Sequence, residues 1–296
     1  MDLGPITQAR PGLSYDQIAE ILANVALQAG PAIMRVYERG DPGARVKPDR
    51  SPVCQADELA EQVILAALAV RLPHWRVIAE ESASRGVIPM CGRGFLLVDP
   101  LDGTKEFLHR NGEFTVNIAL VVDQRPKAGV VYAPALGKLW FGGDHAYGCE
   151  AKPGAPLPAA AARRQLHARP VPAHDMIALT SRSHFEEEAE ALLSSLPLKQ
   201  RRPVGSSVKF CLIAEGEGDL YPRFGPTMEW DVAAGEAILR AAGGQVLSPE
   251  GEPLCYGKKS DGYRNGSFIA WGGIDPRRAA DYVRLPAAAA AMVKLS

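Results

Sequence analysis

Two stretches within 14–72, separated by a loop rich in glycine, proline and charge at 41–52, repeat apolar positions with the period of a helix. From Ser14 onward one face is apolar, and Gln17 stands where a capping box places its second member. We expect Gly30-Pro31 to kink or interrupt this first helix. A second helix fits 56–72. The residues predicted to face inward are Ile18, Ile21, Leu22, Val25 and Ala26 in the first helix, and Leu59, Val63, Ala66, Ala67 and Val70 in the second.

After Pro73 the pattern changes to short apolar runs that are typical of strands. These runs cover 75–79, 95–98, 114–122, 128–132 and 138–141. A stretch rich in alanine, proline and arginine follows at 151–172, and we interpret it as a linker or an insertion. The chain would then divide into an N-terminal α+β domain, 1–150, and a C-terminal α/β domain, 173–296.

The second half alternates strand and helix patterns, which favours an α/β layer. We expect strands at 177–180, around 204, and at 220–221, 245–247 and 267–271, with helices at 185–196, 207–215 and 229–242. The alanine-rich tail, 286–292, carries no further signal. The fold class predicted from the pattern is a mixture of α/β and α+β.

The composition places the chain among globular proteins and excludes two classes of function. Its 296 residues carry 33 Lys+Arg against 34 Asp+Glu, a formal net charge of −1. Nucleic-acid-binding proteins and polybasic membrane binders both need a strong positive field, so neither class fits. With 47% hydrophobic and 23% charged residues, the chain can bury a sizeable core.

The cysteines and the N-terminal residues indicate the compartment. The five cysteines are widely spaced and form no Cys-x-x-Cys pair, which is typical of reduced thiols and not of a disulfide framework. Residues 1–11 do not resemble a signal peptide. No apolar run approaches the roughly 20 residues that span a bilayer. We therefore expect a cytoplasmic protein without an integral membrane segment.

Two acidic segments carry the candidate chemistry. Glu80-Glu81 follows the apolar run at 75–79, and Asp99-Pro-Leu-Asp102-Gly-Thr104 follows the run at 95–98. Carboxylates crowded at the ends of buried strands repel one another unless a cation neutralises them. Hard cations such as Mg²⁺ favour ligation by oxygen atoms alone. The alternative is that both segments are ordinary turns, since Asp, Pro and Gly are common in turns.

A third segment, Trp230-Asp231-Val-Ala-Ala-Gly235, begins the last predicted helix. Taken in this order, Glu80-Glu81, the Asp99–Thr104 segment and Trp230-Asp231 resemble the inositol monophosphatase superfamily of Mg²⁺-dependent, lithium-sensitive phosphatases. This resemblance implies a layered α-β-α-β-α sandwich of the inositol monophosphatase and fructose-1,6-bisphosphatase type, with the active site at the junction of the two halves.

Longer runs narrow the resemblance to one group of that superfamily. The runs that match 3′(2′),5′-bisphosphate nucleotidases of the bacterial CysQ type are Asp99–Phe107, Arg110–Leu120, Gly129–Pro134, Gly205–Cys211, Ala214–Gly216 and Tyr221–Thr227. The resemblance implies a Mg²⁺-dependent enzyme that hydrolyses 3′-phosphoadenosine 5′-phosphate to AMP and phosphate. The small-molecule substrate would be attacked by water, without a side-chain nucleophile.

The resemblance also implies a set of metal ligands. They are Glu80, Asp99, the Leu101 carbonyl, Asp102 and Asp231. Asp99 would bridge two Mg²⁺ ions of a site that holds two or three, and such a pair can stabilise both the entering and the leaving oxygen.

Two catalytic side chains are implied beside the metal ligands. Thr104 would orient the attacking water while Asp57 accepts the threonine proton. The family usually carries threonine three residues before Asp57, whereas this chain has Cys54, which puts the local hydrogen bonding in doubt. A carboxylate that only favours a helix N-terminus is the alternative interpretation of Asp57.

The candidate substrate contacts are Glu80, Leu101, Asp102, Gly103, Thr104, Ser206, Lys209, Arg223 and Asp231. The amides of Gly103 and Thr104 would hold the phosphate. Arg223 lies eight residues before Asp231, where inositol-hydrolysing relatives tend to carry glutamate, and a guanidinium suits a second phosphate. A surface arginine at the end of a strand is the alternative.

Other functions remain open at this point. Within the same superfamily, the substrate could instead be an inositol phosphate, a fructose bisphosphate or histidinol phosphate. A metal-dependent binding protein without turnover is a remote alternative. A homodimer is compatible with the resemblance, as is peripheral association with the inner membrane. Nucleic acid is not an expected partner.

Overall fold

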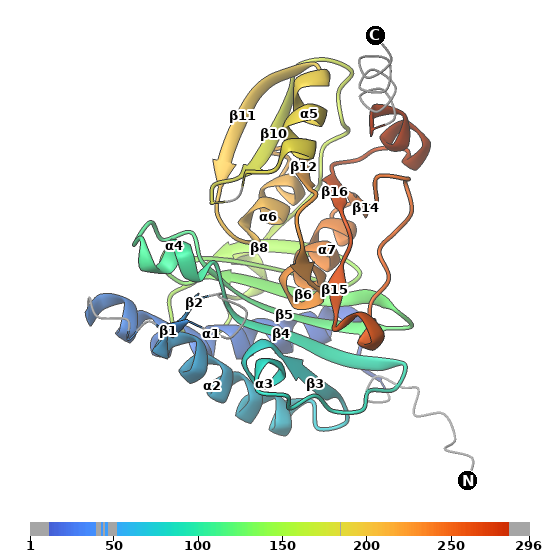
Figure 1. The fold of residues 1–296 in the computed structure, drawn as a ribbon. Coiled ribbons are helices and arrows are strands. Elements are labelled where there is room, and N and C mark those ends of the chain that lie inside the picture. Colours follow the sequence, from blue (N-terminus) through green and yellow to red (C-terminus); the bar gives the residue numbers. More distant parts are fainter. Residues whose placement is uncertain (1–11, 40–42, 44, 47–51, 184, 284–296) are drawn as a thin grey trace.

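The structure is a computed structural model that describes residues 12–39, 43, 45–46, 52–183 and 185–283. The expected alanine-rich tail at 286–292 lies outside the described residues. Two sheets and three helical layers alternate, as Figure 1 shows. The layered α-β-α-β-α arrangement expected from the resemblance is confirmed.

The larger sheet has seven strands in the order β3-β4-β5-β6-β7-β8-β9. Their bounds are β3 (Arg76–Ala79), β4 (Gly94–Asp102), β5 (Thr115–Val122), β6 (Arg125–Ala133), β7 (Lys138–Gly142), β8 (Ala146–Glu150) and β9 (Arg164–Gln165). β3 and β4 are parallel, and the following pairs are antiparallel. The sequence pattern missed β8 and β9, and β9 adds part of the segment 151–172 to this sheet.

The smaller sheet has five strands in the order β11-β10-β12-β16-β14. Their bounds are β10 (Met176–Ser181), β11 (Leu198–Val204), β12 (Leu220–Arg223), β14 (Gln245–Leu247) and β16 (Phe268–Trp271). Two short antiparallel pairs complete the strands: β1 (Arg45–Val46) with β2 (Pro52–Val53), and β13 (Thr227–Met228) with β15 (Arg264–Asn265). All five expected strands of the second half are present.

The helices form the outer and middle layers. Their bounds are α1 (Tyr15–Arg39), α2 (Gln55–Arg71), α3 (Glu80–Ser84), α4 (Thr104–Leu108), α5 (Glu187–Ser195), α6 (Val208–Ala214) and α7 (Glu229–Ala241), with 3₁₀ turns η1 (Ala160–Ala162) and η2 (Lys259–Asp261). In Figure 1, α1 and α2 cover one face of the larger sheet, while α6 and α7 lie between the two sheets. One core lies under α1 and α2, and a second is shared by α6, α7 and both sheets.

The first helix is not interrupted at Gly30-Pro31, contrary to expectation. α1 runs from Tyr15 to Arg39 with Pro31 inside it. A proline removes the donor to the carbonyl four residues before it, here that of Leu27. The Gly154 amide donates to this carbonyl at 2.9 Å instead, so tertiary structure supplies the missing partner. The expected capping box is present, since Ser14 and Gln17 exchange hydrogen bonds.

The buried face of α2 also differs from the expected one. Val70 is 80% exposed, whereas Ile64 and Leu68 are buried. The same buried face carries Asp57 and Glu61, each only 2% exposed. An apolar pattern assigns acids to the solvent side, so the expected face excluded these two carboxylates. Three residues of the expected face are partly buried against the core: Leu59, Val63 and Ala67.

Candidate active site and metal centre

Two parallel strands bring the first acidic segments together. β3 ends at Ala79, which is paired with Val98 of β4. Glu80 therefore begins α3 beside the point where Asp99 continues β4. β4 carries a register irregularity between Asp99 and Asp102, at its carboxyl end.

The third acidic segment, Trp230-Asp231, lies on α7 in the middle helical layer. Asp231 is the third residue of α7, and its Oδ2 accepts a hydrogen bond of 2.8 Å from the Met228 amide. Glu80, Asp99 and Asp231 each offer one oxygen, and these oxygens lie within 4.8 Å of one another. Residues from β4, α3 and α7 thus form one carboxylate group, although more than 130 positions separate Asp99 from Asp231.

The electrostatics of this group fit a cation. Burial raises the pKa of Asp99 well above its ordinary value, and the charges of Glu80, Asp102 and Asp231 raise it further. Burial likewise raises the pKa of Asp231 and of Asp102. Carboxylates held this close are costly when ionised unless a positive charge joins them, and an all-oxygen donor set suits a hard divalent ion. The residues present therefore fit a metal site.

Local hydrogen bonds fix the orientation of the predicted ligands. The Leu101 amide donates to Asp99 at 3.0 Å. Ser207 donates to Asp102 Oδ2 through both its amide and its hydroxyl, each at 2.7 Å. The same hydroxyl lies 3.0 Å from the Asp231 carbonyl. Ser207 therefore links the β4 segment to α7, and sequence reasoning selected its neighbour Ser206 instead.

Thr104 and Asp57 meet as expected. The Thr104 hydroxyl lies 3.3 Å from Asp57 Oδ1, and 3.5 Å from the Leu101 carbonyl. Asp57 is the third residue of α2, and its Oδ2 accepts from both the amide and the thiol of Cys54, each at 2.9 Å. One oxygen of Asp57 thus caps its helix and the other faces Thr104. The cysteine retains the hydrogen-bonding pattern that its departure from the family had put in doubt.

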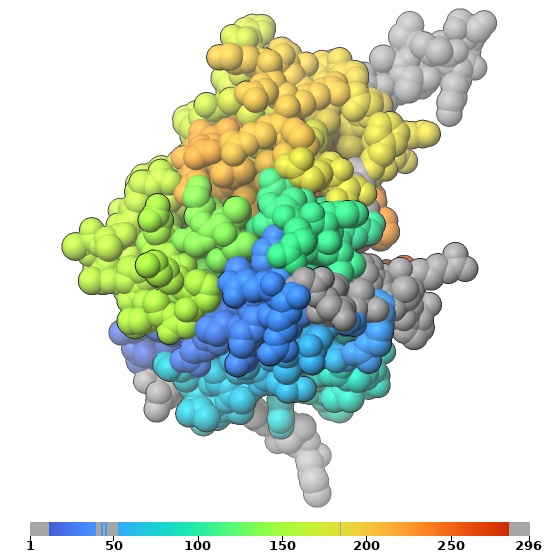
Figure 2. Space-filling view, turned by 90° about the vertical axis from the view of Figure 1, so that its left-hand side faces the viewer, coloured from blue at the N-terminus to red at the C-terminus, as the bar shows by residue number. Residues whose placement is uncertain are grey.

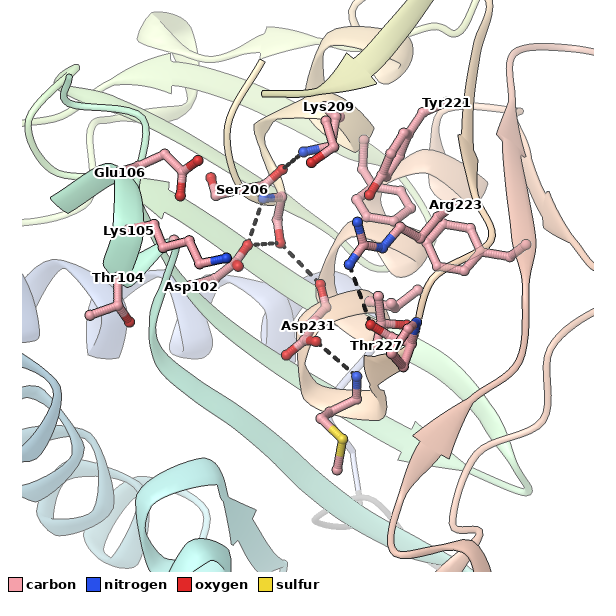
Figure 3. Close-up of a pocket in the computed structure, with 18 of the residues that line it drawn as sticks. Asp102, Thr104, Lys105, Glu106, Ser206, Lys209, Tyr221, Arg223, Thr227 and Asp231 are labelled. Carbon is pink, nitrogen blue, oxygen red and sulfur yellow. Dashed lines mark hydrogen bonds between the residues drawn. The ribbon is translucent and has the colours of Figure 1, made fainter. Parts of the chain in front are cut away.

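A cavity of about 570 Å³ opens beside these groups, as Figure 3 shows. The predicted site residues that line it are Glu80, Asp102, Gly103, Thr104, Ser206, Lys209, Arg223 and Asp231. Gly103 has φ +89°, and a Cβ there would lie 3.2 Å from the Glu113 carbonyl oxygen. Only glycine fits this close left-handed turn without strain.

The cationic side of the cavity is built from Lys209 and Arg223. Lys209 Nζ donates to the carbonyls of Val204 and Ser206, at 3.1 and 2.6 Å, and lies 4.8 Å from the ring centroid of Tyr221. Burial lowers the pKa of Lys209 to about 8, although the Asp102 charge raises it. The ammonium therefore already has partners within the protein.

Arg223 is a buried arginine and not a surface one. It lies on β12, is 8% exposed, and Figure 3 shows its guanidinium pointing into the cavity on the side of Asp231. Its Nη1 forms a 2.6 Å ion pair with Glu186, and each of the two side chains is 10% exposed. Glu186 additionally accepts from the Phe224 amide at 2.6 Å. This counter-ion could not be predicted from a local pattern, because Glu186 lies 37 positions before Arg223 among other glutamates.

The segment that carries Thr104 touches both halves of the molecule. In Figure 2 this green segment lies between α1, in blue, and residues of the second half, in yellow. Arg110 donates to the Tyr37 carbonyl on α1 at 2.6 Å. On the other side, Glu113 forms a double hydrogen bond with Arg182, both at 2.9 Å. These contacts tie the segment that carries Thr104 to α1 on one side and to the second half of the chain on the other.

Comparison with known proteins places this site in a family. Residues 14–282 match the inositol monophosphatase family. The chain belongs to that family. It is 44% identical to 3′(2′),5′-bisphosphate nucleotidase CysQ of Salmonella typhimurium over 238 residues, 80% of this chain and 93% of that protein. It is 42% identical to the protein of the same name from Escherichia coli K12 over 242 residues, 81% and 93% of the two chains.

A solved structure agrees with these relatives. CysQ from Bacteroides thetaiotaomicron, a bacterial member of the inositol monophosphatase family, has a TM-score of 0.74 and 38% identity, covering 89% of this chain and 100% of that one. The resemblance drawn from the sequence is thus confirmed. Within the described residues, no helix of this family member is both long and apolar enough to cross a bilayer.

Proposed function

We propose that the chain is a 3′(2′),5′-bisphosphate nucleotidase that hydrolyses 3′-phosphoadenosine 5′-phosphate to AMP and phosphate. The observation that carries the proposal is the carboxylate group of Glu80, Asp99 and Asp231 beside the Thr104–Asp57 pair, at one end of a cavity with a cationic far side. Relatives that are 42–44% identical over four fifths of this chain bear the name of that activity.

The carboxylate group would hold Mg²⁺, in two or three positions, through Glu80, Asp99, the Leu101 carbonyl, Asp102 and Asp231. When bound, the ions would supply a water of lowered pKa and stabilise the charge that develops on the phosphoryl group. Phosphoryl transfer needs mainly this positioning and electrostatic stabilisation, because the protein has little covalent chemistry to perform.

Thr104 and Asp57 would orient the attacking water. The threonine proton points to Asp57 Oδ1, which leaves the hydroxyl oxygen able to accept a hydrogen bond from water. The water oxygen forms the new bond to phosphorus, and the ester bond to the 3′ oxygen breaks. The attacking water loses one proton as it bonds to phosphorus, and the 3′ oxygen gains one as AMP leaves, so the step is balanced. The amides of Gly103 and Thr104 would hold the phosphate on the same side.

Arg223, Lys209 and Ser206 would contact the rest of the substrate. A guanidinium offers a planar pair of donors that suits the 5′ phosphate. The ion pair with Glu186 holds this guanidinium in one orientation before substrate arrives, which reduces the cost of ordering it on binding. Cytoplasmic location and a homodimer remain predictions.

The experiment is phosphate release from 3′-phosphoadenosine 5′-phosphate, inositol 1-phosphate and fructose 1,6-bisphosphate at equal concentrations, with Mg²⁺ and with chelator. We expect Mg²⁺-dependent release with a strong preference for the nucleotide. The preference should fall in Arg223→Glu. Preferential release from inositol 1-phosphate would retain the metal site and reject the nucleotidase. No release from any substrate would favour the binding protein without turnover.

A further inference from the structure

A second buried carboxylate on α2 lies one helical turn after Asp57. Glu61 is 2% exposed and faces the start of α3. Its Oε2 accepts from the amides of Glu81 and Ser82, at 2.8 and 3.2 Å. Its Oε1 accepts from the Ser82 hydroxyl at 2.7 Å and from Arg85 Nη2 at 3.0 Å. Four donors therefore converge on one side chain.

The two backbone donors lie at the start of α3, where the amides have no hydrogen-bond acceptor within the helix. The helix begins directly at Glu80, with no side-chain cap from the preceding Ala79. Glu61 provides that cap from another helix. It thereby fixes the backbone of the two residues that follow Glu80, and with it the direction in which the Glu80 side chain leaves α3.

Glu80 is one of the three residues whose oxygens lie within 4.8 Å of one another. The other two carboxylates are each held by a local hydrogen bond: Asp99 accepts from the Leu101 amide, and Asp231 accepts from the Met228 amide. A five-residue helix has few bonds of its own with which to hold Glu80 against the repulsion of these two carboxylates. The hydrogen bonds that Glu61 accepts from the backbone of α3 keep Glu80 from moving away from the other two carboxylates.

We propose that Glu61 is a positioning residue that holds Glu80 in place for the metal ion. The inference rests on the metal site of the proposed function, but not on the identity of the substrate. Groups that orient metal ligands typically change metal affinity by about 10–100-fold when altered. In this chain, α2 would then serve the site twice, through Asp57 toward Thr104 and through Glu61 toward Glu80.

The test measures Mg²⁺ binding by titration calorimetry on the full chain, with Glu61→Gln as the variant. The amide keeps the shape of the side chain but replaces one accepting oxygen with a donor that faces other donors. We expect Mg²⁺ affinity to fall by about 10–100-fold. Phosphate release should recover most of its rate at saturating Mg²⁺, so that the half-saturating Mg²⁺ concentration changes more than kcat.

Asp219→Asn is the matched control. Asp219 is a fully buried carboxylate that accepts from Arg169 and from the Ile177 amide, at 2.6–2.7 Å, in the smaller sheet. Both Asp219→Asn and Glu61→Gln should lower the melting temperature measured in chelator, but Asp219→Asn should leave Mg²⁺ affinity unchanged. Arg85→Gln removes only the exposed donor to Glu61 and should change Mg²⁺ affinity by less than about threefold.

Wild-type Mg²⁺ affinity in folded Glu61→Gln, or an equal loss in Asp219→Asn, would overturn the inference. Should Glu61→Gln fail to fold, Glu61→Asp is measured instead, and its shorter reach should also weaken Mg²⁺ binding. If the wild type binds Mg²⁺ but does not hydrolyse the nucleotide, the proposed function fails while the calorimetry still decides the role of Glu61.

Discussion

The two ends of the cavity differ in the charges that lie around their ionisable side chains. At the carboxylate end, the charges near Asp99 are of like sign and raise its pKa. At the cationic end, Arg223 has Glu186 as a counter-ion, and Lys209 is held by two carbonyls. The carboxylates of the first end therefore need a cation from solution, whereas both cations of the second end already have partners within the protein.

Removing one carboxylate tests the first half of this comparison. Asp99→Asn should abolish phosphate release, with a loss beyond the ~10⁴-fold upper range of a missing proton-transfer group, because the central oxygen donor of the site is replaced. In chelator the variant should melt at a higher temperature than the wild type, since it relieves the repulsion around Asp99. Differential scanning calorimetry without Mg²⁺ measures the expected rise in melting temperature. The same scan with Mg²⁺ shows whether the stabilisation by the ion is lost.

The same prediction has a pH dependence. The Asp99 carboxyl binds a proton more tightly in the folded chain than in the unfolded one, where its pKa is near 3.8. Without metal, the wild type should therefore gain stability as the pH falls through the raised pKa toward 3.8, and lose it as the pH rises. Asp99→Asn should show a flatter profile. Parallel profiles for the two proteins in chelator would contradict the repulsion.

Thr104 lies at the same end but carries no charge. Thr104→Val should lower kcat by about 10²-fold, the lower range for a group that assists proton transfer, and Asp57→Asn should do the same. Because neither is required to neutralise the carboxylate group, Mg²⁺ affinity should stay within about threefold of the wild type. Steady-state kinetics and calorimetry on the two variants and their double mutant check this. Additive losses would indicate that the two side chains do not act as a unit.

Replacing Arg223 and its counter-ion Glu186 tests the role of the cationic end. Arg223→Gln should raise KM for the nucleotide about tenfold, the effect of one hydrogen bond to a charged group. It should also destabilise the fold by up to about 3–5 kcal/mol, because the Glu186 side chain, only 10% exposed, loses its partner. Adding Glu186→Gln should restore much of the stability but not KM. A double variant that regains both would assign Arg223 a structural role alone.

The carboxylate end was also far more predictable from the sequence than the cationic end. Asp99 and Asp102 follow directly on an apolar run, so strand prediction alone places them at the end of a strand. At the cationic end, Glu186 contacts Arg223 from a distant segment, which no local pattern encodes. Ser207, at the carboxylate end, was missed for the same reason, because its partners Asp102 and Asp231 lie far away in the sequence. The same limit explains α2. Three residues of its expected face pack against the core, but Ala66 and Val70 are exposed, and Glu61 lies inward.

Within the described residues, β10, β12, β14 and β16 lie where the alternation placed them, since each is short and largely apolar. β11 is mostly exposed and polar, and only its end near Val204 was expected. The missed strand β9 consists of Arg164 and Gln165, both exposed, and is formed by pairing with β8 at the edge of the sheet. Pro31 within α1 is a comparable case, because the Gly154 amide that replaces the lost donor belongs to a segment interpreted as a linker. Features formed by tertiary pairing thus lie beyond what a local pattern can predict.

The smallest expected effect concerns Cys54, on the side of Asp57 that faces away from Thr104. Burial and the Asp57 charge raise the thiol pKa to about 12, so the group stays protonated and donates to Asp57 across the range of an assay. Cys54→Ala removes a weak donor and should lower kcat about threefold, near the lower value for one hydrogen bond. Cys54→Ser should recover the rate, and Cys149→Ser, far along the sheet, should leave it unchanged. A Cys54→Ala enzyme with full activity would show that the backbone amide of residue 54 alone suffices to orient Asp57.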